Sequence, residues 1–179
     1  PVDRIVYTAM LTDRGTFVSD LTVVRTGDES FSVITAAAQT AHDLDWLERQ
    51  AHVRGSRVAI DDVSTASGVL GLMGPRSRDL LQTLTETDLS NDAFSFGTAR
   101  RIDVAGHTVL AARITYVGEL GWELHIPGDR TTAIFDALAV AGAPHGLSLA
   151  GTTAQNSLRM EKGYVSWGHD VSFDDTPLE

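Results

Sequence analysis

Asp20 is an acidic residue within an otherwise largely apolar segment of the sequence. It lies within residues 17–25, a run rich in β-branched residues that predicts a strand. Both faces of this strand are largely apolar, so we expect both to be covered. Aspartate is a poor strand former, and an unpaired buried carboxylate is strongly unfavourable. The carboxylate is therefore either satisfied by a nearby arginine or turn amide, or it serves as a base or ligand anchor.

A second candidate site lies in residues 116–127. Alternate positions of this strand-like run carry apolar residues that we expect to face the core, namely Trp122, Leu124 and Ile126. Gly121, Glu123 and His125 then face the other way. A glycine beside an acid leaves room for a flat ligand, and a carboxylate is the natural partner of two parallel N–H groups. The alternative is a glutamate that simply faces solvent.

A third group of polar residues lies near the end of the chain. Arg159 either holds an anionic group or pairs structurally with Glu161 or another acid. His169 and Asp170 either orient a side chain or form a turn. We favour the structural interpretation for both.

Composition excludes several classes of function. There is no cysteine, which rules out disulfides, thiolate nucleophiles and cysteine-based metal sites, and the six histidines are scattered. Phosphate-binding glycine loops, nucleophile elbows, zinc-protease helices and dinucleotide fingerprints are absent. A net charge of −10 without a basic run disfavours nucleic acids and membrane surfaces as partners. We expect a chain of the cytoplasm, with no membrane anchor.

The elements that must position these residues follow from periodicity. Apolar residues at three- and four-residue spacing predict an amphipathic helix over 37–54, with His42, Asp45, Glu48 and Arg49 outside. A turn at Gly27 predicts that two of the strands form a hairpin. Strands are expected at 5–11, 17–25, 30–35, 57–63, 67–73 and within 98–127.

Three further helices complete the prediction. One carries Leu80, Leu81 and Leu84, one is capped by Asp129 and extends to about Ala143, and the last extends from about Thr152 to Gly163. Helices and strands do not alternate strictly. We therefore predict one α+β domain with mainly antiparallel sheet and packed helices over residues 1–179.

Four stretches together identify a family. They are residues 7–22, 69–77, 114–127 and 157–179, spread over nearly the whole chain. On them the chain resembles the aminomethyltransferase (glycine-cleavage T-protein) family, and most closely its form in dimethylglycine and sarcosine dehydrogenases. Residues 88–99 are similar to this dehydrogenase-fused branch.

The resemblance implies a fold, a cofactor and roles for three residues. The fold would be part of a tetrahydrofolate-binding domain of the aminomethyltransferase type. Asp20 falls on the acid beside the reactive folate nitrogens, where it would position or deprotonate the amine that captures the one-carbon unit. Glu123 falls on the carboxylate that holds the pterin edge, and Tyr116 on a tyrosine of the same pocket.

The chain also departs from the T-protein pattern. T-proteins usually have an acid where this chain has Ser19, an asparagine where it has Ala36, and an arginine where it has Gln155. These differences argue against transfer from a lipoyl-carried aminomethyl group. They leave the dehydrogenase-type reaction, in which an iminium or formaldehyde unit is trapped as methylenetetrahydrofolate. A T-protein-like aminomethyltransferase or demethylase, or a folate-binding or structural module without catalysis, are the alternatives.

The ends of the sequence, Pro1 and Glu179, suggest part of a longer protein. By the resemblance, the complete protein would add a flavin domain, an earlier portion of the folate domain and a C-terminal β-barrel. FAD would belong to the missing part, so we expect this chain alone to be inactive in amine oxidation. Its expected partners are folate, an intermediate derived from a small N-methyl amine, and that flavin domain.

Overall fold

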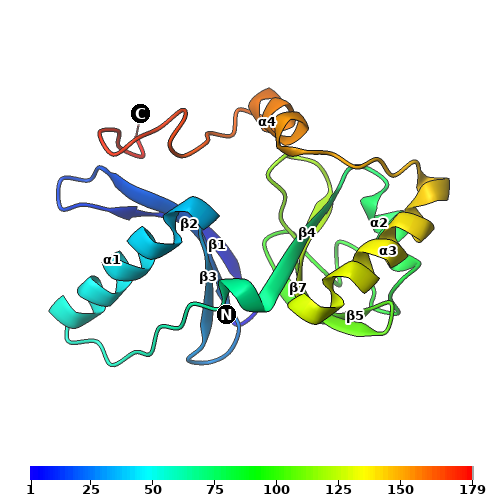
Figure 1. The fold of residues 1–179 in the computed structure, drawn as a ribbon, viewed down its shortest axis with the longest axis horizontal. Coiled ribbons are helices and arrows are strands. Elements are labelled where there is room, and N and C mark those ends of the chain that lie inside the picture. Colours follow the sequence, from blue (N-terminus) through cyan, green and yellow to red (C-terminus); the bar gives the residue numbers. More distant parts are fainter. Residues whose placement is uncertain (179) are drawn as a thin grey trace. The chain divides into compact units, whose positions relative to one another are not determined.

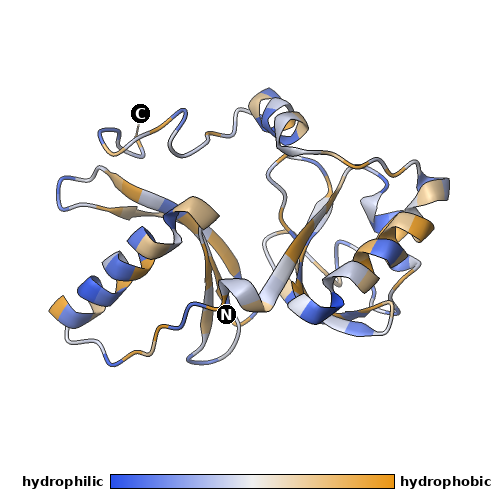
Figure 2. Ribbon diagram, in the orientation of Figure 1, coloured by the Kyte–Doolittle hydropathy of each residue, from blue (hydrophilic) through white to orange (hydrophobic). Residues whose placement is uncertain are grey.

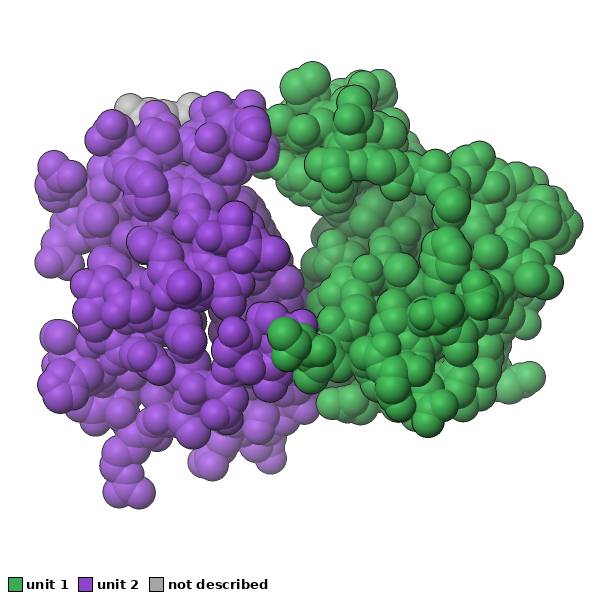
Figure 3. Space-filling view, viewed as in Figure 1, with its two compact units in different colours: residues 1, 3–5, 65–165 green, residues 2, 6–64, 166–179 purple. Residues whose placement is uncertain are grey.

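The structure is a computed structural model that describes residues 1–178. It divides into two compact units, which Figure 3 shows in different colours. Unit 1 contains residues 1, 3–5 and 65–165, and unit 2 contains residues 2, 6–64 and the C-terminal segment from Ser166. We describe each unit by itself.

Unit 2 is built on a three-stranded sheet in the order β1-β2-β3. Its strands are β1 (Ile5–Leu11), β2 (Phe17–Arg25) and β3 (Phe31–Ile34), which confirms the three predicted strands of this region. β2 and β3 are antiparallel, with Val23 opposite Val33, so the predicted hairpin is confirmed. Val18, Ser19 and Leu21 are all buried, although they alternate between the two faces of β2. Both faces of this part of β2 are therefore covered, as expected.

The amphipathic helix of unit 2 is α1 (Thr40–Val53), which follows a short 3₁₀ turn, η1 (Ala37–Gln39). Hydrophilic and hydrophobic residues alternate along α1 in Figure 2. His42, Asp45, Glu48 and Arg49 are exposed, as predicted. The buried residue of α1 is an acid, Asp43, which the periodicity did not single out.

The strand predicted at 57–63 is wrong, because this segment has neither helix nor strand. Val58 and Val63 are 62% and 63% exposed, so their side chains are not packed. The carboxylate of Asp62 accepts hydrogen bonds from the backbone N–H and the hydroxyl of Ser64, and thereby forms the turn into η2 (Ser64–Ala66). β-Branched residues favour a strand only where a partner strand supplies packing, and such local side-chain bonds compete with it.

Unit 1 is built on a four-stranded antiparallel sheet in the order β4-β7-β6-β5. The strands are β4 (Ser67–Met73), β5 (Ala99–Val104), β6 (His107–Ala112) and β7 (Gly121–Pro127). β5 and β6 are joined at Gly106, which adopts a φ of 80°. The predicted strand at 67–73, the β structure within 98–127 and the mainly antiparallel sheet are confirmed.

One face of this sheet is covered by helices and carries the core. The helices of unit 1 are α2 (Ser77–Gln82), α3 (Thr131–Gly142) and α4 (Thr152–Glu161), with 3₁₀ turns η3 (Gly128–Arg130) and η4 (Ala143–His145). α3 packs against β4 and α2 (Figure 1). The largest fully buried side chains of this core include Trp122, Phe94, Leu124, Ile126 and Ile134.

Two helix ends test the capping predictions. Asp129 does not cap α3: it lies in η3, where its carboxylate is 3.2 Å from the guanidinium of Arg130, and α3 begins without a side-chain cap. The end of α4 agrees with the prediction, since Gly163 is left-handed and the N–H of Tyr164 bonds to the carbonyl of Arg159. Within residues 1–178, the helices are too short or too polar to cross a membrane.

Candidate functional site

Glu123 stands on the face of β7 opposite the core. Trp122, Leu124 and Ile126 are fully buried on the core side, which confirms the predicted alternation. In the sheet, Glu123 lies between Gly71 of β4 and Ala112 of β6. These neighbours have a hydrogen and a methyl group as side chains. The carboxylate therefore stands between two small residues, and the flexible end of Met73 lies where a side chain at Gly71 would begin.

The carboxylate of Glu123 is largely withdrawn from water without a cationic partner. Its side chain is 24% exposed, and among the described residues no lysine or arginine pairs with it. Burial raises its pKa above the ordinary value for glutamate. His125 follows on the same face, with Nε2 4.0 Å from Oε2 of Glu123, beyond hydrogen-bonding distance. Burial lowers the pKa of His125.

Tyr116 lies in the loop before β7, in the same unit as Glu123. Its hydroxyl donates a 2.7 Å hydrogen bond to the carbonyl of Val165, and its ring stacks on Tyr164 at 6.3 Å between centroids. Tyr116 thus holds the segment after α4 against this loop. A cavity of about 270 Å³ lies beside this loop and is lined in part by Tyr164 and Gly118. No pattern in the sequence predicted this cavity.

Asp20 lies in unit 2 and is half-buried on β2. Oδ2 of Asp20 accepts a 2.8 Å hydrogen bond from the hydroxyl of Tyr7 on the neighbouring strand β1. The expected partner was an arginine or a turn amide, and the structure instead supplies a phenol. Because Tyr7 is 63% exposed, this contact lies at the surface of its unit. The carboxylate is held on one side and is accessible to a ligand.

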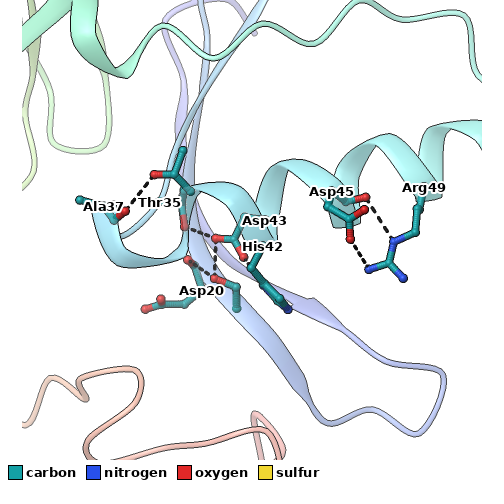
Figure 4. Close-up of polar contacts among 9 residues, drawn as sticks. Asp20, Thr35, Ala37, His42, Asp43, Asp45 and Arg49 are labelled. Atoms are coloured by element: carbon teal, nitrogen blue, oxygen red, sulfur yellow. Dashed lines mark hydrogen bonds and ion pairs between the residues drawn. The ribbon is translucent and has the colours of Figure 1, made fainter.

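A buried polar network, which was not predicted from the sequence, lies behind Asp20. The carboxylate of Asp43 accepts hydrogen bonds from the hydroxyls of Ser19, at 2.9 Å, and Thr35, and it lies 2.9 Å from Nδ1 of His42 (Figure 4). Asp43 is 1% exposed. It therefore ties α1 to β2, next to Asp20, and to the end of β3. Asp43 precedes the apolar residue Leu47 by four residues and therefore lies on the same, packed side of the helix. This spacing was the sequence signal from which the burial of Asp43 could have been predicted.

The remaining polar candidates have structural partners. Arg159 is buried and donates to the carbonyl of Tyr164 at 2.9 Å and to the side chain of Asn156 at 3.2 Å. The carboxylate of Asp170 accepts a bond from the N–H of Ser166, within the turn that contains His169. Both observations fit the structural interpretation. Residues 1–178 hold no group of three or more histidines or acids that could bind a metal.

A comparison with solved structures shows the class of fold. The chain is similar to the solved structure of glycine cleavage system aminomethyltransferase T from Bartonella henselae, with a TM-score of 0.81 and 23% sequence identity. The match covers 99% of this chain and 45% of that protein. The fold is thus that of an aminomethyltransferase, as the resemblance implied.

The family follows from sequence comparison. The family described as "GCVT N-terminal domain" matches residues 1–179, and the chain belongs to it. The chain is 41% identical over 170 residues to human "Dimethylglycine dehydrogenase, mitochondrial", covering 95% of this chain and 20% of that protein. It is 40% identical over 192 residues to "Sarcosine dehydrogenase, mitochondrial" from Mus musculus, covering 100% of this chain and 21% of that protein. The chain therefore spans about a fifth of the length of these relatives.

Proposed function

We propose that this chain is the tetrahydrofolate-binding part of a one-carbon-transfer enzyme, with Glu123 as the residue that binds the pterin edge. The observation that carries the proposal is the Glu123 carboxylate itself. It is 24% exposed, lacks a lysine or arginine partner among the described residues, and stands between Gly71 and Ala112. A carboxylate in these surroundings is suited to a flat ligand that brings its own N–H donors.

The chemistry of the carboxylate supports a pterin in particular. The edge of this ring presents two parallel N–H groups, which two carboxylate oxygens can accept together. Such bonds are strong where water is excluded, and they favour the ionised form that burial of Glu123 otherwise disfavours. Binding would thus relieve the desolvation of the free site. When bound, tetrahydrofolate supplies two amine nitrogens that capture a one-carbon unit at the oxidation level of formaldehyde.

Asp20 is proposed as the acid–base residue of this transfer. Its carboxylate accepts the 2.8 Å bond from Tyr7, and Asp43 holds the neighbouring residue Ser19 on the other side of β2. Capture of an iminium carbon by two amine nitrogens would release two N–H protons, one taken up by the departing amine and one by a base, without net oxidation. A carboxylate with one oxygen held in place is suited to accept and pass on such a proton.

The complete enzyme is proposed from the relatives. The similarity to dimethylglycine and sarcosine dehydrogenases suggests that a flavin domain elsewhere in the full protein oxidises an N-methyl amine. The folate-binding domain described here would then receive the product of that oxidation. The cytoplasmic location stays a prediction, because both relatives are mitochondrial by name.

Calorimetric titration with tetrahydrofolate tests the proposal. We expect saturable binding by this chain and at least tenfold weaker binding by Glu123→Gln, since the amide replaces one acceptor oxygen by a donor (about 1.4 kcal/mol per tenfold). Glu119→Gln is the matched control, because Glu119 is exposed in the loop before β7 and faces Lys162 at 3.8 Å. If the protein does not bind tetrahydrofolate, or if both variants bind like the wild type, the assignment of Glu123 is wrong.

A further inference from the structure

The face of β7 that carries Glu123 also carries a buried nitrogen without a partner. Nε2 of His125 is inaccessible to water and makes no hydrogen bond within residues 1–178. Most buried polar atoms in proteins are hydrogen-bonded, and an unsatisfied one is destabilising. An orphaned nitrogen that points toward the proposed ligand-binding carboxylate therefore calls for an explanation.

The surroundings of His125 in the sheet offer it no polar side chain. Its neighbours across the strands are Val69 of β4 and Leu110 of β6, both apolar. The nearest charged atom given by the geometry is Oε2 of Glu123, at 4.0 Å. This distance is too long for a direct hydrogen bond, and it leaves the two side chains separate but directed at the same region.

Burial also fixes the protonation state in which His125 can act. Desolvation lowers its pKa, so the imidazole is neutral near pH 7, with one N–H donor and one acceptor nitrogen. A neutral imidazole does not neutralise the Glu123 carboxylate as a cation would. It can still donate a hydrogen bond from Nε2 to an uncharged acceptor.

We propose that His125 is a ligand-recognising residue, which donates from Nε2 to the carbonyl oxygen beside the N–H pair held by Glu123. This inference rests on the proposed function. A 2-amino-4-oxo pterin edge presents donor, donor and acceptor in sequence, and Glu123 with His125 presents two acceptors and one donor. The two side chains, two residues apart on one strand, thus form the complement of the whole edge rather than of its N–H pair alone.

A structural role and a ligand-binding role predict opposite effects of substitution. If His125 served packing or folding, its replacement would lower the melting temperature. If Nε2 awaits a ligand, His125→Phe removes an unsatisfied buried nitrogen but keeps a ring, so the free protein stays as stable or becomes more stable. The same substitution must weaken binding.

The experiment is calorimetric titration of this chain with tetrahydrofolate and with a tetrahydropterin that lacks the aminobenzoyl-glutamate tail. Melting temperatures of the wild type, Glu123→Gln, His125→Phe and His125→Gln are measured alongside. We expect about tenfold weaker binding of both ligands by His125→Phe, and recovery toward wild-type affinity by His125→Gln, which restores an N–H donor. Should the phenylalanine variant not fold, His125→Leu takes its place.

The possible results separate the inference from the proposed function. Binding that Glu123→Gln weakens but His125→Phe leaves unchanged would overturn the role of His125 alone. Absence of any binding by the wild type would overturn both proposals. Equal losses for His125→Phe and His125→Gln, each with a lowered melting temperature, would show that His125 is structural.

Discussion

The imidazole Nε2 of His125 and the carboxylate Oε2 of Glu123 lie 4.0 Å apart on one face of β7, without a hydrogen bond between them. Burial pushes the pKa of the acid up and that of the base down, so each group resists the charge that would let them form an ion pair. The two largely buried side chains therefore leave each other without a hydrogen-bond partner in the free protein. This relationship gives the first prediction.

Glu123→Gln should raise the stability of the free protein near neutral pH. The raised pKa means that the unfolded state ionises first as the pH rises above 4.5, so stability is lost between that value and the folded-state pKa. The neutral amide avoids this loss, which amounts to about 1.4 kcal/mol per unit of pKa shift. Thermal unfolding at about pH 7 should show a higher melting temperature for the variant, and the difference should vanish near pH 4. A lower melting temperature at both pH values would contradict the prediction.

Asp43→Ala should destabilise unit 2 by about 2–4 kcal/mol. The substitution leaves the buried hydroxyl of Ser19 and the half-buried hydroxyl of Thr35 without their acceptor, and an unsatisfied buried group is unfavourable by about 1–3 kcal/mol. Urea unfolding followed by circular dichroism measures the change. Asp45→Ala is the matched control on the same helix, because its exposed pair with Arg49 should contribute no more than about 0.5 kcal/mol. Equal effects of the two substitutions would refute a structural role for the network.

Asp20→Asn should lower the rate of methylenetetrahydrofolate formation by about 100-fold or more, the usual contribution of a general base. Because Asp20 is half-buried and its Tyr7 bond can be kept by the amide oxygen, folding should be little affected. The rate is measured with the full-length protein that contains this chain. Asp13→Asn, in the exposed turn after β1, controls for loss of a negative charge nearby. An unchanged product yield with Asp20→Asn would exclude the acid–base role.

Gly71→Val should weaken tetrahydrofolate binding by tenfold or more without unfolding the protein. Gly71 lies opposite Glu123, and a Cβ there would meet only the flexible end of Met73, with its Cε at 2.8 Å. Valine favours strands, so stability should change by no more than about 1 kcal/mol. The valine side chain would occupy the space that we assign to the pterin.

Gly121→Ala provides the contrast for that experiment. Its Cβ would lie 2.3 Å from the carbonyl oxygen of Leu72, where β4 and β7 approach each other, so we expect a marked loss of stability. Melting temperature and calorimetric affinity together separate the two glycines. Normal folate binding by a folded Gly71→Val protein would show that the ligand does not use this space.

Local periodicity in the sequence was sufficient for much of the fold. The strands at 5–11, 17–25 and 67–73 have the predicted bounds, because alternation and β-branched residues act within a single strand. The same alternation placed Glu123 and His125 on the face opposite Trp122. The strand predicted at 57–63 does not form. A strand there would need a neighbouring strand to pair with, and nothing in the local sequence shows whether one exists.

The sequence by itself determined the family, the order of the elements and the residue types available for chemistry. Tertiary structure decided the partners: Tyr7 for Asp20, two hydroxyls for Asp43, and Gly71 beside Glu123. These contacts join residues up to 52 positions apart, as between Gly71 and Glu123, and depend on strand register and helix docking. Desolvation of Glu123 and His125 depends on the same packing, because burial is set by what covers a residue and not by its neighbours in the chain.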